Sequence, residues 1–216
     1  MPGTDKSGGG IRKQLFAWGL AHCTGYYEGA LLERKRALFA GLTGTVLEIG
    51  PGAGANLPLY PKGIKWIGIE PNLYMHGYLM KKIKELGMNA EVRHMSVEHM
   101  DLDDIKADAV VSTVVLCSVH NPKSALHEVL RALKSGGKFI FIEHVAAPPG
   151  TLQRYAQEWL RPIWSFFFDR CRPNRETGKL IRAAGFESVQ FEHFRVPVPV
   201  VSIHIAGIAT KGRVAK

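Results

Sequence analysis

The chain has 216 residues, of which 46% are hydrophobic and 22% charged, as expected of one globular α/β domain with a sizeable core. Its formal net charge of +9 favours anionic neighbours such as nucleic acid or a lipid surface. The basic residues are dispersed in pairs and triplets without interleaved aromatic residues, however, and this pattern disfavours a nucleic-acid groove.

Cysteine usage and the first residues bear on the cellular compartment. The three cysteines are widely spaced and form neither a CxxC metal pattern nor a disulfide framework, so we expect no metal and a reducing, cytoplasmic compartment. The first ten residues are polar and Gly-rich, unlike a signal peptide. The stretch 14–27 lacks Lys, Arg, Asp and Glu but is too short to span a bilayer.

The order of predicted elements indicates the fold class. Residues 1–10 predict a disordered tail, and residues 11–40 predict one or two helices, broken near Thr24, that form an N-terminal helical cap. Strands then alternate with helices, which predicts an α/β, Rossmann-like, doubly wound, mostly parallel seven-stranded sheet with an antiparallel C-terminal strand. Residues 11–216 are expected to form one domain, with an aromatic insertion at 146–175.

Within this pattern, individual elements have expected bounds. Helices are predicted at 73–86 and 176–184, and another from 121 to the glycine pair at 136–137. Apolar runs predict strands at 109–115 and 138–142, and alternation predicts two more at 186–194 and 200–209.

A buried strand runs into a glycine-rich loop at residues 46–56. Gly50, Gly52 and Gly54 stand at alternate positions, where the absence of Cβ lets the backbone turn sharply and approach a ligand. The spacing also fits a dinucleotide fingerprint, but Glu48 would repel a pyrophosphate, and the loop has no Lys or Arg. S-adenosylmethionine (SAM) fits better, because it carries an ammonium group and no phosphate.

A second buried strand ends in Glu70, which follows Gly54 by 16 positions. An acid at this point can accept hydrogen bonds from both ribose hydroxyls of a nucleoside. A short strand at 92–95 then precedes a loop containing Ser96, Val97 and Glu98, whose backbone N–H groups and side chains can reach adenine. Capping of a following turn is an equally weighted alternative for Glu98.

Several blocks of residues carry a resemblance to a known family. The most discriminating are Leu-Cys-Ser-Val at 116–119 and Glu-His-Val-Ala-Ala at 143–147, together with the glycine loop and Glu70-Pro71-Asn72. Over about residues 40–212 the chain resembles class I SAM-dependent methyltransferases, and more specifically the methyltransferase-like seven family of alkyl-thiol S-methyltransferases. Members of that family carry an N-terminal hydrophobic membrane segment, whereas the corresponding region here is at most amphipathic.

The resemblance implies SAM as cofactor and a small lipophilic substrate, foremost an alkyl or aryl thiol. The alternatives are N-, O- or C-methylation of a quinone or lipid amine, and a non-catalytic SAM-binding or RNA-associated role. The predicted cofactor site comprises Glu48, Gly50, Gly52, Gly54, Asn56, Glu70, Pro71, Ser96, Val97, Glu98 and Val115. The predicted walls of the substrate pocket are Leu116, Cys117, Trp164 and Phe167.

Three side chains near the expected reaction centre each have a structural alternative. His144 can take a proton from a thiol, since its unperturbed pKa is near neutrality, or it can be a purely structural histidine. For Cys117 and Cys171, a role as small buried hydrophobic residues is favoured over one as reactive thiols. A thiol whose pKa is about 8.5 can also react through alignment and desolvation alone, without a dedicated base.

The segment 159–168 is unusually aromatic. It is predicted to wall an apolar substrate pocket or to dock on a membrane beside Arg154 and Arg161, with packing on the core as the alternative. Peripheral membrane contact therefore stays open, and the sequence does not indicate an oligomeric state.

Overall fold

The computed structural model describes residues 9–100, 102 and 105–213. Residues 1–8 of the predicted disordered tail therefore lie outside the described residues. Gly9 and Gly10 already belong to the first helix, so the tail prediction is wrong for these two positions.

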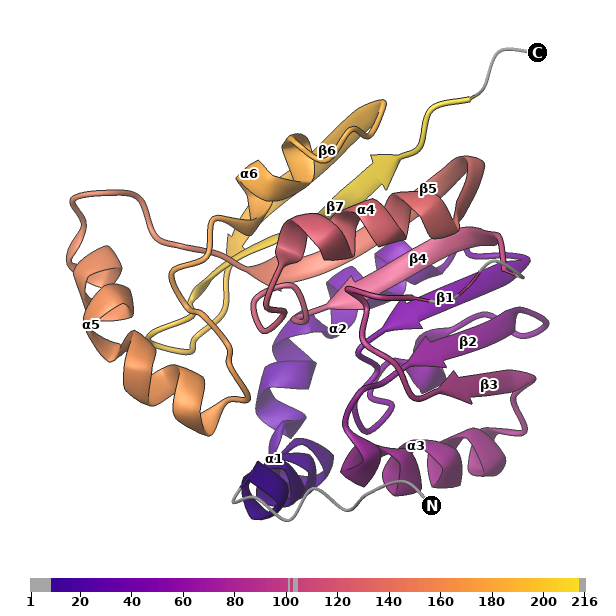
Figure 1. The fold of residues 1–216 in the computed structure, drawn as a ribbon, viewed down its shortest axis with the longest axis horizontal. Coiled ribbons are helices and arrows are strands. Elements are labelled where there is room, and N and C mark those ends of the chain that lie inside the picture. The colour runs from indigo at the N-terminus through magenta and orange to yellow at the C-terminus, as the bar shows by residue number, and fades with distance from the viewer. Residues whose placement is uncertain (1–8, 101, 103–104, 214–216) are drawn as a thin grey trace.

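Two helices precede the sheet, α1 (Gly9–Cys23) and α2 (Gly25–Phe39), and the break between them falls at Thr24 as predicted. The Thr24 hydroxyl donates to the Leu20 carbonyl at 2.9 Å, which closes α1. The Thr24 carbonyl then accepts from the Glu28 amide at 2.9 Å and opens α2. In Figure 1, α1 lies beside α3 (Leu73–Leu86) at the lower edge of the molecule, and α2 passes behind the sheet.

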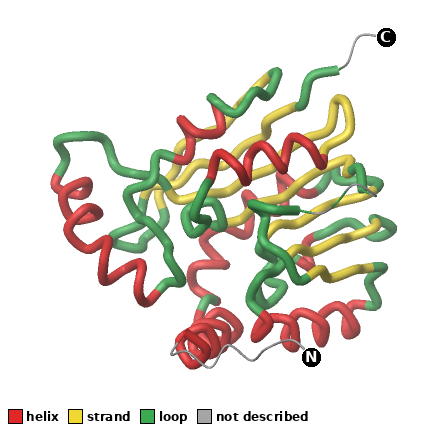
Figure 2. The backbone as a smooth tube through the Cα atoms, in the orientation of Figure 1, coloured by secondary structure: helices red, strands yellow, loops and turns green. Residues whose placement is uncertain are grey.

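A seven-stranded sheet forms the centre of the described chain (Figures 1 and 2). Its order is β3-β2-β1-β4-β5-β7-β6, and among the described strands β7 alone runs in the direction opposite to the rest. The predicted doubly wound, mostly parallel sheet with an antiparallel C-terminal strand is confirmed. The strands are β1 (Thr45–Ile49), β2 (Lys65–Ile69), β3 (Ala90–Arg93), β4 (Ala107–Thr113), β5 (Leu133–His144), β6 (Ser188–Arg195) and β7 (Ile203–Thr210).

The strand order reverses at β1, which pairs with β2 on one side and β4 on the other. Ile49 is in register with both Ile69 and Ser112, so these three strands end side by side. In an open α/β sheet, the crevice outside the carboxyl ends at such a reversal is where ligands bind.

Helices cover both faces of the central part of the sheet, so β1, β2, β4 and β5 are largely buried. Leu47 and Ile49 face a core shared with α4 (Pro122–Ala132) and α6 (Thr177–Arg182), while Val46 faces one shared with α2 and α3. Glu48 lies on the same side of β1 as Val46, since side chains alternate along a strand. A short 3-10 turn, η1 (Leu57–Leu59), follows the glycine loop.

Element bounds differ from the predictions where the backbone is unusual. β4 ends two residues early, at Thr113, because Val114 adopts a φ of 57°. β5 begins five residues early, at Leu133, because Gly136 with a φ of 74° accommodates a register shift against β4. β7 starts three residues late, at Ile203.

The predicted aromatic insertion contains α5 (Leu152–Phe167), which lies beyond the carboxyl ends of β4 and β5 (Figure 1). Gln157 is its one fully buried side chain. The Gln157 amide accepts from the Ala147 N–H at 2.8 Å and donates to the carbonyls of Val200 at 3.0 Å and Val145 at 3.3 Å. No helix in the described part of the chain is both long and apolar enough to cross a membrane.

We expect Gln157→Ala to lower the free energy of unfolding by about 2 kcal/mol, because buried backbone partners lose their hydrogen bonds. Urea denaturation measures the loss. Trp159→Ala is the matched control on the same helix. The Trp159 side chain is 87% exposed, so its removal should change the free energy of unfolding by no more than about 0.5 kcal/mol. Equal losses in the two variants would show that Gln157 does not anchor α5.

Candidate active site

The glycine loop that follows β1 has a backbone only glycine adopts cheaply. Gly50 and Gly52 have φ values of 59° and 56°. A Cβ on Gly50 would stand 2.7 Å from a methyl of Val115, whereas the space around a Cβ on Gly52 is nearly open. Gly54 is different, because its close neighbours are Leu57 and Leu79, so it serves packing and lies off the cavity described below.

Glu48 is buried and accepts hydrogen bonds from three neutral donors. Its Oε1 accepts from Asn56 Nδ2 at 2.8 Å, and its Oε2 accepts from the Tyr60 hydroxyl at 2.8 Å and Trp66 Nε1 at 3.0 Å. Burial raises the pKa of Glu48, and these hydrogen bonds only partly offset the effect. Asn56 Oδ1, also buried, has no hydrogen-bond partner. An acceptor oxygen therefore lies free beside the glycine loop, as an ammonium group requires.

Glu70 ends β2 and binds the glycine loop. Its Oε2 accepts from the Gly52 amide at 2.9 Å and its Oε1 from the Asn72 amide at 2.8 Å. Burial raises the pKa of Glu70 to about 7, although the two amide hydrogen bonds act in the opposite direction. The carbonyl of the neighbouring Pro71 contacts a ring nitrogen of His94 at 3.0 Å.

The loop predicted to reach adenine is occupied with its own contacts. The Ser96 hydroxyl donates to Glu98 Oε2 at 3.2 Å, and Glu98 Oε1 accepts from the Asn121 amide at the start of α4. Val97 is buried in the core. Glu98 thus holds the start of α4, 23 positions away, rather than capping the turn that follows it, and none of the three residues lines the cavity described next.

A cavity of about 370 Å³ lies between the glycine loop, the two N-terminal helices and the end of α5. Its walls combine aromatic, thiol and imidazole groups with the polar floor at Glu48. The predicted residues that line it are Glu48, Gly50, Gly52, Asn56, Cys117, His144 and Trp164. Phe16 of the N-terminal helical cap and Phe168 of the aromatic segment also line it, and Tyr27 and Lys35 are wall residues that sequence reasoning missed.

Two predicted wall residues lie elsewhere. Leu116 is fully buried in the core between the sheet and α4, and Phe167 is 63% exposed, so their placement in the pocket wall is wrong. Phe168 lines the cavity instead and stacks on Trp164, with ring centroids 4.3 Å apart. α5 ends at Phe167, and the aromatic composition gave no signal for which ring turns inward.

Cys117, His144 and Cys171 meet in the cavity wall, where all three are buried. His144 Nε2 lies 3.0 Å from Cys171 Sγ, which also accepts from Trp164 Nε1 at 3.3 Å. Burial lowers the pKa of His144, but Cys117 and the Glu143 carboxylate raise it, and the net shift is upward. The predicted role of His144 as a base stays a prediction, since Nε2 contacts a sulfur of this chain.

Glu143 is a buried acid that sequence reasoning did not assign to the site. Its Oε1 accepts from the Ser112 hydroxyl at 2.7 Å and from the amides of Val115 at 3.0 Å and Leu116 at 3.1 Å. Arg175 donates to the carbonyls of Leu116 and Val119 from the other side. Together they fix the corner after β4 that carries Cys117.

Arg12 of α1 joins two helices that each contribute residues to the cavity wall, α1 and α5. Its guanidinium donates to the Phe166 carbonyl at 2.7 Å and pairs with Asp169 at 3.4 Å. α1 and the end of α5 are therefore in direct contact.

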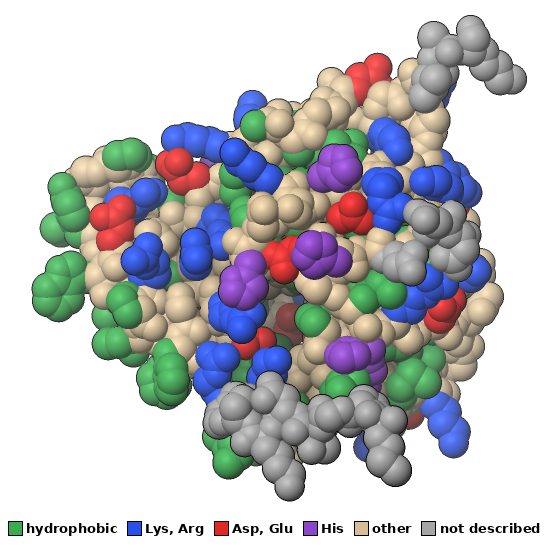
Figure 3. All heavy atoms as spheres, viewed as in Figure 1, with side chains coloured by type: hydrophobic (Ala, Val, Ile, Leu, Met, Phe, Trp, Pro, Cys, Tyr) green, Lys and Arg blue, Asp and Glu red, His purple; other side chains and the backbone are tan. Residues whose placement is uncertain are grey.

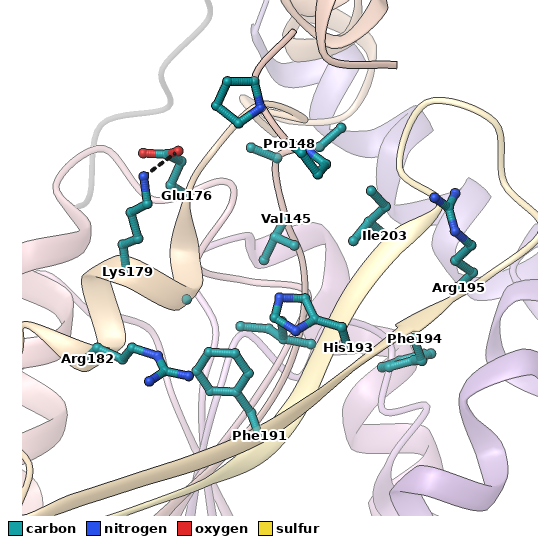
Figure 4. A pocket seen from close by; sticks show the side chains of 15 residues that line it. Val145, Pro148, Glu176, Lys179, Arg182, Phe191, His193, Phe194, Arg195 and Ile203 are labelled. Atoms are coloured by element: carbon teal, nitrogen blue, oxygen red, sulfur yellow. Dashed lines mark hydrogen bonds and ion pairs between the residues drawn. The ribbon is translucent and has the colours of Figure 1, made fainter. Parts of the chain in front are cut away.

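A larger hollow, of about 560 Å³, lies between α6, the end of β5 and the strands β6 and β7 (Figure 4). Its labelled side chains include an ion pair between Lys179 and Glu176, at 2.9 Å, and Arg182 over the Phe191 ring. None of the predicted site residues lines it, so size does not decide which hollow is the active site.

Comparison with known proteins agrees with this geometry. A methyltransferase domain family model matches residues 47–141. The chain is 36% identical to the human thiol S-methyltransferase TMT1A, in an alignment that covers 93% of this chain and 88% of that protein. It is also 36% identical to the human thiol S-methyltransferase TMT1B, with 92% of this chain and 87% of that protein covered. A SAM-dependent methyltransferase from Thermotoga maritima is 25% identical with a TM-score of 0.63, covering 90% of this chain and 92% of its own. The N-methyltransferase NodS from Bradyrhizobium japonicum, solved with S-adenosyl-L-homocysteine, has a TM-score of 0.69 at 13% identity, over 93% and 98%.

The reversal at β1, the glycine loop and the acid ending β2 define a class I SAM-dependent methyltransferase. Within that class, the chain belongs to the family of the thiol S-methyltransferases TMT1A and TMT1B. SAM is its cofactor, and the residues fit that group: the loop leaves an open glycine cradle, and Asn56 Oδ1 is a free buried acceptor.

The pKa of Glu70 predicts a pH dependence of SAM binding. A carboxyl whose pKa is about 7 is largely protonated at pH 6, and hydroxyl donors bind the carboxylate form better, so binding should release a proton. The dissociation constant should therefore rise as the pH falls from 8 to 6. Glu70→Gln, which cannot titrate, should remove this dependence in calorimetry. The same slope in both proteins would contradict the prediction.

Proposed function

We propose that this methyltransferase transfers the methyl group of SAM to the sulfur of a small lipophilic alkyl or aryl thiol. The observation that carries the proposal is the 370 Å³ cavity, whose aromatic and thiol-lined wall adjoins the glycine loop. Its apolar side chains suit a lipophilic acceptor, and the relatives similar over nearly the whole chain are named thiol S-methyltransferases. Cavities of this size, lined by apolar side chains and a few polar groups, are typical of sites that bind small molecules.

In this proposal the cofactor runs from the cavity along the loop to the end of β2. Asn56 Oδ1, next to Glu48, accepts from the ammonium group. Glu70 accepts from the ribose hydroxyls in exchange for its contact with the Gly52 amide. Ser96 and Val97 are assigned to the adenine end, where the Ser96 hydroxyl would exchange its contact with Glu98 for one with the base, without the charge assistance of an acid.

SAM supplies an electrophilic methyl group on a sulfonium ion. The chain contributes alignment and exclusion of water, because Phe16, Trp164 and Phe168 enclose the space beside the loop. A thiolate held there would lose its hydration shell and be oriented toward the cofactor site, which would lower the barrier without a dedicated base.

An acceptor panel tests the proposal. With pure protein and labelled SAM, we expect apolar thiols to be methylated, at rates that rise with pH through the pKa of each thiol. Phenols, amines, a quinone precursor and RNA are the comparison substrates. An amine is a pointed comparison, because a phosphatidylethanolamine N-methyltransferase from Cereibacter sphaeroides is 32% identical over half of this chain. Turnover of another class without any thiol turnover would overturn the substrate assignment.

We also propose that the enzyme is cytoplasmic and contacts membranes peripherally through α5 and α1. Figure 3 shows hydrophobic side chains gathered over α5, at the left of the view. They recur at three- and four-residue spacing, which places them on one face of the helix, and α1 presents a second such row. The exposed side chains are Leu152, Tyr155, Trp159, Ile163 and Phe166 on α5, and Ile11, Leu15 and Trp18 on α1.

Sedimentation with vesicles containing phosphatidylserine tests this surface. Trp159→Glu should weaken binding several-fold, because it places a charge on the apolar face of α5. Leu86→Glu, at a 44% exposed residue of α3, is the matched control and should bind like the parent protein. Absence of binding by the parent protein at low salt would refute the membrane proposal and leave the methyltransferase proposal untouched.

A further inference from the structure

Three metal-ligating side chains from separate segments converge on one wall of the acceptor cavity. Cys117 follows β4, His144 ends β5, and Cys171 follows α5. The ligand atoms of the three all lie within 4.8 Å of one another, and all three residues are buried. Each is also among the residues that line the cavity, so the cluster borders open space.

We propose that Cys117, His144 and Cys171 bind one Zn²⁺ ion, whose fourth coordination position opens into the acceptor cavity. Zn–S bonds of about 2.3 Å and Zn–N bonds of about 2.0 Å in a tetrahedron place ligand atoms roughly 3.5–3.8 Å apart. His144 Nε2 and Cys171 Sγ are 3.0 Å apart, so these two atoms would have to move about half an ångström further apart to bind the ion. Three protein ligands with an open fourth position form the pattern of catalytic rather than structural zinc.

The chemistry of the donors selects a borderline-soft cation. Two sulfurs and one imidazole suit zinc and are poor ligands for magnesium or calcium, which take oxygen. Two thiolates also neutralise a divalent ion, so the buried site carries no net charge, and this limits the cost of burial. The Trp164 N–H donates a hydrogen bond to Cys171 Sγ, and such a bond stabilises the thiolate form in which Cys171 would bind the ion.

The orientation of His144 agrees with a ligand role. Its Nε2 lies 3.0 Å from Cys171 Sγ, so one ring nitrogen already faces the proposed ion position. Its Nδ1 is buried without a hydrogen-bond partner in the described part of the chain, and coordination through Nε2 leaves that nitrogen unchanged.

The open position has a further consequence, which rests on the proposed function. A thiol acceptor that coordinates Zn²⁺ releases its proton to bulk solvent as it binds and is held as a thiolate. Its sulfur then forms a bond to the methyl carbon as the bond from that carbon to the sulfonium sulfur breaks. The electron pair of the broken bond stays on S-adenosylhomocysteine. The neutral thioether product is a weaker ligand than a thiolate and leaves the ion.

Metal content tests the site without reference to activity. Reduced, tag-free protein from zinc-supplemented culture should contain about one Zn²⁺ per chain. Replacement by Co²⁺ should give the visible bands of a tetrahedral site and a thiolate-to-cobalt charge-transfer band. Cys117→Ser and Cys171→Ser should lose both signals, whereas Cys23→Ser and His127→Gln, at exposed positions, should retain them. A SAM-induced rise in melting temperature shows which variants remain folded.

The outcomes separate this proposal from the proposed function. Absence of stoichiometric zinc together with absence of a cobalt–thiolate band in the reduced parent protein would overturn the metal site. A disulfide between Cys117 and Cys171 in freshly purified, unreduced protein that cannot be loaded with zinc after reduction would also overturn it. Addition of a thiol acceptor should shift the cobalt bands. Full thiol turnover by zinc-free protein would refute thiolate activation and leave the thiol proposal standing. Bound zinc without thiol turnover would refute the thiol proposal and leave the metal site standing.

Discussion

One buried carboxylate holds the corner on which both halves of the active site depend. Glu143 accepts hydrogen bonds from Ser112 and from the amides of Val115 and Leu116, where the chain leaves β4. Val114 within this corner has a φ of 57°, a conformation that is strained for a β-branched residue and needs such support. Because the corner presses Val115 against the cofactor loop and sets Cys117 beside His144, a change at Glu143 would disturb both ligand sites.

The carboxyl edge of the sheet gathers three buried acids, Glu48, Glu70 and Glu143. Burial is the largest influence on each and raises the pKa of all three. Their hydrogen-bond donors include no cation, with neutral amide, hydroxyl and indole groups on the two that border the loop. A cationic ligand entering this crevice would favour the ionised carboxylates, so the edge is better matched to a sulfonium cofactor than to a phosphate-bearing one.

The fold was predictable because its signals are local. Continuous apolar runs mark the buried strands, and Asn121 and Gly87 mark helix ends as predicted. Contacts between distant segments carry no such signal. The contact between His144 and Cys171 spans 27 positions, far from any metal-ligand spacing, so sequence reasoning treated each residue alone. Whether Phe167 or Phe168 faces the cavity depends on where α5 ends, which composition does not encode.

The clasp between α1 and α5 joins residues separated by most of the chain. Arg12 contacts the carbonyl of Phe166, 154 positions later. Closing so long a loop costs more chain entropy than pairing the parallel strands of the sheet, which are separated by fewer residues. Enclosure of the cavity therefore has to wait until Phe166 and the turn after α5 have left the ribosome. A nascent chain can thus present a formed glycine loop before it has a sealed reaction chamber, and catalytic turnover reports completion of the whole molecule.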